Sequence, residues 1–311
     1  MKWTELMDYR KAYVKLPIMV EYEDKIKSKE IAKASGCPVP ETYFITDDAN
    51  KIPFDKLPKR YVLKPTHYAS ALGVFLMNDG INAFTGKRTS NTEIIKVSQK
   101  YLSMHIAKHL NEWATSKIPR RIIVEEYLPD MNGQFTIPMD YKCFTFHGRV
   151  CMVRVDYDRL LKTQSNDYYN RDFELIDYDG IKSKYRRRYY RGPKPLHWDK
   201  MIEYAEKLGS DFGDFLRVDM YITPDGPVFG EFTLYPGSGR LSTDMVSTDK
   251  IDRYMGALWQ HPGLVLNVGE KPFTREHFDK VLSQFPATRQ LFPISTNRKH
   301  PTCKKCNKTR I

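Results

Sequence analysis

The sequence lacks any apolar run that approaches the roughly 20 residues needed to cross a membrane. Its first stretch, MKWTELMDYRK, also lacks the apolar segment of a signal peptide, so we expect a cytoplasmic protein without a membrane span. Only five cysteines occur in 311 residues, and Cys37, Cys143 and Cys151 lie in apolar or strand-like stretches, which argues against a disulfide framework. Cys303 and Cys306 form a Cys-x2-Cys pair without the second pair that a structural zinc site needs, so a disordered tail is the simpler interpretation.

Acidic residues are absent from two basic segments, residues 182–194 (KSKYRRRYYRGPK) with seven Lys or Arg and residues 297–311 with six. These segments account for the net charge of +12, and the rest of the chain is close to neutral. Such segments favour a polyanionic partner, nucleic acid or an acidic glycan, although a solvated charge run is the commoner explanation for a tail. In the first segment aromatic residues alternate with arginines, as in grooves that bind single-stranded nucleic acid.

Apolar residues make up 41% of the chain and aromatic residues 13%, enough for a buried core in two or three lobes. Apolar periodicity, turn residues and helix-ending glycines predict both helices and strands, hence an α+β protein. Helices are predicted at residues 24–35, 92–116 and 199–208, the last one ended by Gly209. Strands are predicted at residues 42–46, 60–64, 74–77, 121–128, 139–146 and 149–155, followed by a hairpin within residues 215–234.

The hairpin has one polar and one apolar face. Because side chains alternate across a strand, Arg217, Asp219 and Tyr221 share the polar face. The turn is Thr-Pro-Asp-Gly at residues 223–226, in which proline presets φ and glycine accepts positive φ. A surface hairpin with solvated carboxylates is the simplest interpretation of this pattern alone.

The register of the hairpin places two carboxylates opposite each other. If Ile222 pairs with Val228, Asp219 lies across from Glu231. Like charges in this position are destabilising, and a hard cation such as Mg²⁺, which prefers carboxylate oxygens, would compensate them. Arg217 could then hold a phosphate oxygen. Without metal, we expect Glu231→Gln to be neutral or mildly stabilising.

In order along the chain, these segments resemble the ATP-grasp superfamily, most closely its TupA-like branch, which is associated with teichuronopeptide and other polysaccharide biosynthesis. The resemblance covers roughly residues 24–240 and includes LPKRYVLKPTHYASALGV, IIVEEYL, DYKCFTFHGR, VDYDR, RVDMY and GEFTLYPGSG. It implies an ATP-grasp fold, with two α+β lobes of mainly antiparallel sheets that clamp a nucleotide. The implied division is an N-terminal segment (1–58), a small lobe (59–128), a large lobe with the metal-binding hairpin (129–285) and a basic tail (286–311).

The resemblance implies ATP and Mg²⁺ as cofactors. Asp219 and Glu231 match the magnesium ligands, and Thr233 stands where the superfamily usually has asparagine. Arg217 and Lys64 match residues that act on the transferred phosphate. The phosphate loop, usually glycine-rich, has here a single glycine, Gly73. The implied nucleotide-binding residues are Lys25, Lys64, Ser70, Glu125, Glu126, Tyr127, Leu128, Lys142 and Arg217.

The implied activity is that of an ATP-dependent carboxylate–amine ligase, in which an acyl phosphate precedes the amide. The amine or the carboxylate would belong to an acidic glycan or another surface polymer, with an amino acid or similar group as the second substrate. Gly237 and Ser238 resemble residues beside the acceptor substrate in D-alanine ligases, and the basic residues Arg186, Arg187 and Arg188 are predicted to bind substrate. Two alternatives are a protein that binds or modifies nucleic acid and a pseudoenzyme with a weakened phosphate loop.

Overall fold

The computed structural model describes residues 1–69, 71–104, 111–159, 162–177, 181–182, 186–240 and 246–285. The helices are α1 (Trp3–Tyr13), α2 (Pro17–Glu23), α3 (Lys27–Ala34), α4 (Asn91–Ser103), α6 (Trp198–Phe212), α8 (Asp249–Gln260), α9 (Gly263–Leu266) and α10 (Arg275–Gln284), with 3₁₀ turns η1 (Ala49–Lys51), η2 (Thr115–Lys117) and η3 (Pro236–Gly239). The strands are β1 (Thr42–Thr46), β2 (Arg60–Pro65), β3 (Phe75–Asn78), β4 (Ile81–Asn82), β5 (Lys87–Arg88), β6 (Ile122–Glu126), β7 (Asp140–Phe146), β8 (Arg149–Tyr157), β9 (Ser165–Asn170), β10 (Ile181–Lys182), β11 (Arg186–Arg187), β12 (Leu216–Thr223), β13 (Gly226–Thr233) and β14 (Val246–Ser247).

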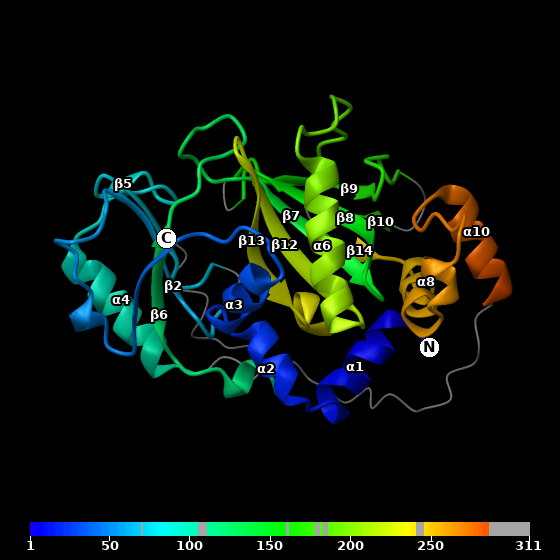
Figure 1. The fold of residues 1–311 in the computed structure, drawn as a ribbon, viewed down its shortest axis with the longest axis horizontal. Helices are drawn as coiled ribbons and strands as arrows, with labels where there is room; N and C mark the ends of the chain where they lie inside the picture. The colour runs from blue at the N-terminus through cyan, green and yellow to red at the C-terminus, as the bar shows by residue number, and fades with distance from the viewer. Residues whose placement is uncertain are drawn as a thin grey trace.

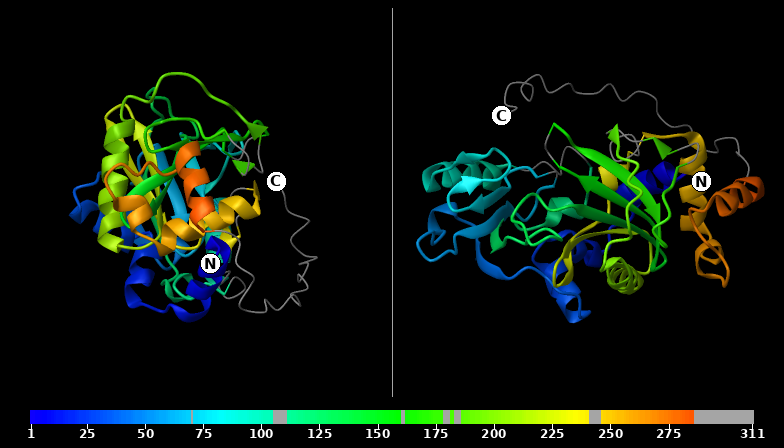
Figure 2. Two further views of the ribbon diagram at one scale, coloured as in Figure 1. Left: turned by 90° about the vertical axis from the view of Figure 1, so that its right-hand side faces the viewer. Right: turned by 90° about the horizontal axis from the view of Figure 1, so that it is seen from above.

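Two six-stranded sheets form the framework, and the predicted α+β class with mainly antiparallel sheets is confirmed. The first has the order β1-β6-β2-β3-β4-β5 and is antiparallel throughout. The second has the order β11-β9-β8-β7-β12-β13, and among its pairs only β11 and β9 run parallel. The first sheet lies at one end of the long axis, the second lies in the middle, and α8 and α10 lie at the other end (Figures 1 and 2).

The first sheet encloses a small core against α4. Strand β2 alternates between buried and less buried residues, as expected for a strand with one covered face. Leu63 of β2, Ile122 and Val124 of β6, and Ile94 of α4 are all fully buried in this core. The predicted division at residue 58 separates β1 from the sheet in which β1 pairs with β6.

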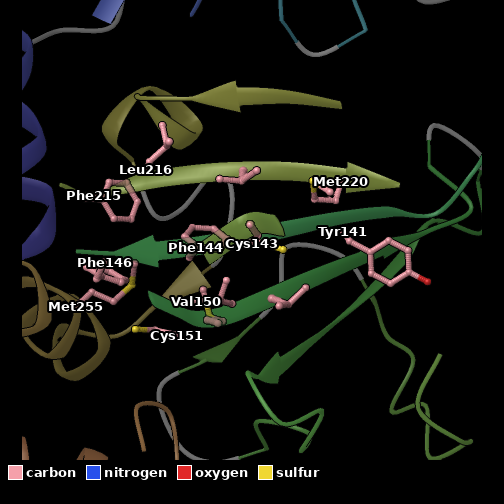
Figure 3. Packing of buried hydrophobic residues seen from close by; sticks show 14 of the residues in the cluster. Tyr141, Cys143, Phe144, Phe146, Val150, Cys151, Phe215, Leu216, Met220 and Met255 are labelled. Carbon is pink, nitrogen blue, oxygen red and sulfur yellow. The ribbon is translucent and has the colours of Figure 1, made fainter. Parts of the chain in front are cut away.

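The second sheet is covered on one face by α6, which buries Trp198, Met201, Ala205 and Leu208. The opposite face is divided. Near α1 and α8 it is apolar, where Phe215 contacts rings of both helices. Farther along β7 and β12 the same face carries charged side chains, which form the site described below. Figure 3 shows the apolar packing around Phe144, Phe146 and Phe215.

Helix α6 runs past the predicted end at Gly209 and stops at Gly213, whose φ of 75° is left-handed. Gly209 lies inside the helix because it packs against β7. A Cβ at this position would lie 2.7 Å from Oγ1 of Thr145, so the glycine serves close packing and not chain termination. The prediction that Gly209 ends the helix was wrong for this reason.

Helix α4 ends at Ser103 and not at residue 116 as predicted, because Met104 is already extended, with φ −100° and ψ 157°. Residues 105–110 of the predicted helix lie outside the described residues, and residues 115–117 form η2. The other predicted elements occur within a few residues of their expected bounds; α3, for example, starts at Lys27 and not at Asp24. No helix among the described residues is long and apolar enough to cross a membrane.

Candidate active site

The two carboxylates of the hairpin lie opposite each other as predicted, but the strand register near the turn differs from the predicted one. Asp219 pairs with Glu231, whereas Ile222 pairs with Pro227 and not with Val228. A bulge after Asp219 accounts for the difference, because Gly230 is an extra residue that shifts the register by one. A Cβ at Gly230 would lie 2.9 Å from the carbonyl oxygen of Asp219, so the bulge requires glycine.

Asp219 is held by two cations on the charged face of the second sheet. Nε of Arg217 donates to Oδ1 at 2.6 Å and Nη2 to Oδ2 at 2.7 Å, while Nζ of Lys142 donates to Oδ2 at 3.0 Å. All three residues are buried, and such buried charges persist only when paired. Arg217 also donates to Oγ1 of Thr233 at 2.9 Å, which brings together the predicted metal-ligand set and the predicted phosphate-binding arginine. Lys142 is further paired with Asp140 on its own strand.

Glu231 is compensated by Lys25, whose Nζ lies 2.5 Å from Oε2. Burial alone would raise the pKa of Glu231, but attraction to Lys25 outweighs burial and lowers it. The like-charge pair across the hairpin is therefore neutralised by the chain's own cations. The expectation that Glu231→Gln is neutral or stabilising without metal does not fit this geometry, because the substitution would remove the partner of Lys25.

Glu125 holds two lysines at the edge of the first sheet. Its Oε1 lies 2.5 Å from Nζ of Lys64, and its Oε2 accepts from Nζ of Lys29 at 2.8 Å. Burial would raise the pKa of Glu125, but the charges of Lys64 and Lys29 lower it. Lys29 also donates to Oγ1 of Thr42 at 2.8 Å, and burial lowers its pKa. Sequence reasoning missed Lys29, which lies in the first turn of α3.

A cavity lies between the two sheets, and both ion pairs Lys25–Glu231 and Lys64–Glu125 line it. Its lining includes many of the residues predicted to bind nucleotide, among them the hinge segment of residues 125–128. The loop before β3 contributes Ala69 and Ala71, and the apolar walls come from both sheets. Arg217, Asp219 and Lys142 do not line it, and Ser70 lies outside the described residues. The lining residues are Lys25, Pro40, Val62, Lys64, Tyr68, Ala69, Ala71, Val74, Leu76, Phe84, Glu125, Glu126, Tyr127, Leu128, Ile137, Pro138, Arg159, Tyr221, Gly230 and Glu231.

Arg159 is a cavity residue that sequence reasoning did not assign. Its Nη1 lies 2.7 Å from Oδ2 of Asp140, which anchors the guanidinium. Burial would lower the pKa of Arg159, but Asp140 and neighbouring acidic groups raise it, so the side chain stays charged. The available signal was the VDYDR segment, which places this arginine directly after β8.

The residues predicted to bind substrate fall into two places. Gly237 and Ser238 form part of η3 with left-handed φ values of 56° each, at the exit of the hairpin. Arg187 and Arg188 lie beyond β9, away from the cavity lining. Nε of Arg187 lies 3.2 Å from Oδ1 of the fully buried Asp167, so Arg187 supports the fold locally. Arg188 is half-exposed and stacks over a tyrosine ring, and for Arg186 the structure describes the backbone alone.

The sequence matches the family model described as TupA-like ATPgrasp over residues 5–260. This chain belongs to the TupA-like ATP-grasp family. The predicted resemblance and the predicted ATP-grasp fold are thereby confirmed. No curated protein matches the sequence.

Solved structures with a similar fold include D-alanine–D-alanine ligase from Helicobacter pylori, at 15% identity and a TM-score of 0.43, with 77% of this chain and 60% of that chain covered. L-amino acid ligase from Bacillus licheniformis matches at 14% identity and a TM-score of 0.40, with 72% and 44% covered. An ADP complex of N5-carboxyaminoimidazole ribonucleotide synthetase matches at 13% identity and a TM-score of 0.43, with 87% and 59% covered. The chain thus spans about 60% of the length of the D-alanine–D-alanine ligase.

The donor set of the site fits magnesium bound together with nucleotide. Mg²⁺ in such sites takes one or two protein carboxylates and completes its shell with phosphate oxygens and water. Asp219 and Glu231 face each other from paired strands and supply two carboxylates. Among the described residues, no group of three or more His, Cys, Asp or Glu side chains is placed to hold a metal ion.

Proposed function

We propose that this protein is an ATP- and Mg²⁺-dependent carboxylate–amine ligase that forms an amide through an acyl phosphate. A carboxylate is a poor electrophile, so the γ-phosphoryl group of ATP must first be transferred to it before an amine can displace phosphate. The observation that carries the proposal is the cavity in which Lys25, Lys64 and the hinge segment meet Glu231, the residue paired with Asp219.

The lysines of the cavity would act by changing partners. Nζ of Lys25 lies 2.5 Å from Oε2 of Glu231, and Nζ of Lys64 lies 2.5 Å from Oε1 of Glu125. When phosphates enter, both lysines can turn to the phosphate oxygens, because Lys29 remains to neutralise Glu125. Such positioning and charge neutralisation are what phosphoryl transfer requires of a protein.

The bound metal would supply charge neutralisation at the transferred phosphate. Asp219 and Glu231, with Thr233 beside them, are the residues that would hold it. Arg217, anchored on both Asp219 and Thr233, is placed to orient the phosphoryl group or the substrate carboxylate.

The substrates are proposed from the family and from charge. TupA-like proteins are associated with polysaccharide biosynthesis, which supports an acidic glycan or other surface polymer as one substrate and an amino acid or similar group as the other. The exposed part of the basic segment around Arg188 supports binding of an acidic substrate, with nucleic acid as a second candidate. We keep the cytoplasm as the proposed location and the four-part division of the chain as a proposal, with β1 counted in the small lobe.

Two measurements test this proposal. Thermal unfolding with ATP, with and without Mg²⁺, should show stabilisation that depends on both, since a ligand bound only by the folded state raises its apparent stability. ADP release should then be scanned over amino acids combined with uronic-acid acceptors. Stabilisation without ADP release from any pair would favour a pseudoenzyme, and a steeply salt-dependent gel shift with DNA would favour the nucleic-acid alternative.

A further inference from the structure

Two carboxylates outside the cavity share a corner in which negative charge exceeds positive charge. Glu23 is the last residue of α2, and Glu112 lies just before η2, which contacts α2. The corner also contains Thr115, Ser238 of η3, and Lys11 of α1, and we call these five residues the acidic corner. In Figure 1 α1 and α2 run along the lower edge, below the hairpin of β12 and β13.

The two carboxylates of the acidic corner share one hydroxyl donor, and Glu112 has a second donor in the hydroxyl of Ser238. The hydroxyl of Thr115 lies 3.4 Å from Oε2 of Glu23 and 3.4 Å from Oε2 of Glu112, so the two oxygens face it from two directions. A threonine hydroxyl carries a single hydrogen and can donate to only one of them at a time. The other oxygen is left without that proton.

Neither glutamate forms an ion pair with a described residue. Oε1 of Glu23 accepts from the backbone N–H of Leu234 at 2.6 Å, which fixes the side chain but adds no full positive charge. Lys11 donates to the carbonyl oxygen and hydroxyl of Ser238 at 3.0 and 3.2 Å and is thus tied to η3. Burial and the charge of Glu112 raise the pKa of Glu23 to about 7, and they outweigh the opposing effects of Lys25 and of the Leu234 N–H.

A buried tyrosine lies beside the two glutamates. Tyr235 is 4% exposed, and its hydroxyl oxygen interacts with the backbone N–H of Ala114, which lowers its pKa, but no described residue accepts the hydroxyl hydrogen. Besides burial, the negative charges of Glu23 and Glu112 raise its pKa, which places the hydroxyl beside the pair. Buried polar groups in native proteins are generally satisfied, so the corner is built for a further donor.

The corner adjoins the proposed reaction centre. Glu23 lies two residues before Lys25. Its Oε1 accepts from the backbone N–H of Leu234, the residue that follows Thr233. The side chain of Glu23 is partly exposed, whereas Glu112 is 8% exposed. Ser238 belongs to the segment that resembles the acceptor-binding residues of D-alanine ligases, which places the corner on the substrate side of the hairpin.

We propose that the acidic corner binds the ammonium group of the amine substrate, held between the carboxylates of Glu23 and Glu112. This inference rests on the proposed ligase function and names the charge of one substrate: a primary amine that arrives as a cation. An ammonium group has three donors, and each carboxylate oxygen has capacity to accept a further hydrogen bond. Lys11 and Ser238 at the rim would meet an anionic group on the same substrate, such as the carboxylate of an amino acid.

The chemistry balances in this arrangement. The bound ammonium gives one proton to a corner carboxylate, and the free amine attacks the carbonyl carbon of the acyl phosphate. The new C–N bond forms as the C–O bond to phosphate breaks, and phosphate leaves with the electron pair. The second proton of the nitrogen goes to the departing phosphate, which leaves an amide, hydrogen phosphate and a protonated carboxyl group.

The first test uses ethylammonium chloride as the probe and needs no knowledge of the substrate. The Tm of the full chain in about 50 mM ethylammonium chloride is compared with its Tm in sodium chloride at equal ionic strength. We expect the Tm of the wild type to rise by about 2 °C or more, because a ligand that binds only the folded state raises the free energy of unfolding. Glu23→Gln and Glu112→Gln should lose this rise, whereas the exposed Glu21→Gln on the same helix should keep it. An equal rise in wild type and Glu23→Gln, or none in the wild type, would overturn the inference.

The second test compares two nucleophiles in the reaction. Hydroxylamine is neutral at pH 8 and captures acyl phosphates as hydroxamates, so it does not need the acidic corner. We expect Glu23→Gln to lower the ratio of amide to hydroxamate product at least tenfold, with Glu21→Gln at the wild-type ratio. An unchanged ratio would overturn the inference while the ligase function stands. Absence of both products from the wild type would instead contradict the ligase function, whereas the ethylammonium measurement would still decide on the corner.

Discussion

The pKa values of the carboxylates are lowered in the cavity and raised in the acidic corner. In the cavity, Glu125 and Glu231 each lie 2.5 Å from a lysine nitrogen, and this attraction outweighs burial and lowers their pKa values. In the corner, Glu23 and Glu112 share one hydroxyl, and burial raises the pKa of both. The contrast supports a different ligand charge for each region. Lysines paired with carboxylates can turn to phosphates, whereas carboxylates without an ion-pair partner among the described residues suit a cation.

The largest effect is expected from Lys64→Ala, which removes a cation of the cavity. ADP formation should fall by about 10²- to 10³-fold, as when one stabilising donor is removed from an active site. The fold should persist, because Glu125 keeps Lys29 as a partner. Steady-state ADP release checks this, with the exposed Lys56→Ala as the matched control.

Asp219→Asn should abolish turnover as well, but it should also lower stability, since Arg217 and Lys142 both lose a charged partner. Lys64→Ala is therefore the cleaner variant. Wild-type turnover in both would contradict the assignment of the cavity to phosphoryl transfer.

The second effect concerns the stability of the ligand-free protein. Glu231→Gln should lower the free energy of unfolding by about 1 to 3 kcal/mol, because Lys25 is left largely buried without its partner. The pair lowers the pKa of Glu231, so its contribution is complete above about pH 5 and is lost as the pH falls. Urea unfolding of both proteins between pH 3 and 7 measures this, and a difference that grows toward low pH would contradict it.

The sequence predicted the faces of the strands better than the partners of the charges. Strict alternation placed Arg217 and Asp219 on one face and the apolar residues on the other, because a two-residue period has no alternative once one face is buried. The bulge at Gly230 escaped prediction, since a glycine in a strand marks several kinds of irregularity. The placement of Asp219 opposite Glu231 was nevertheless right.

Residues that act across the two sheets could not be predicted. Glu23, Lys29 and Arg159 are single charged residues whose partners lie far away in the sequence. Their roles come from folding that brings α2, α3 and the end of β8 to the same region, as in the contact of Glu23 with Leu234. Sequence spacing contains no information on such distant partners without a known relative.

The third effect has the opposite sign and separates the two regions directly. Glu23→Gln should raise the free energy of unfolding at pH 8 by about 1 kcal/mol, since the native state disfavours this ionised carboxylate. Its pKa is raised to about 7 in the folded state, so the cost of Glu23 appears as the pH rises above about 4.5 and is complete above pH 7. Urea unfolding at pH 4 should therefore show little difference from the wild type. A loss of stability at pH 8 would mean that Glu23 has a cationic partner and that the two regions do not differ.

The smallest effect is expected at Arg188, a weakly paired cation 3.8 Å from Asp158 and 4.7 Å from the centre of the Tyr157 ring. Arg188→Gln should change stability by less than about 1 kcal/mol, as is usual for an exposed pair. If the basic segment receives an acidic substrate, the KM for that substrate should rise by about two- to threefold, and its salt dependence should become flatter because one screened contact is lost. Arg191→Gln, a more exposed neighbour, serves as the control for general attraction, and deletion of residues 297–311 should leave KM unchanged. If the deletion raises KM while Arg188→Gln is silent, the polyanion binds through the tail, and the surplus of positive charge near β11 has no part in substrate binding.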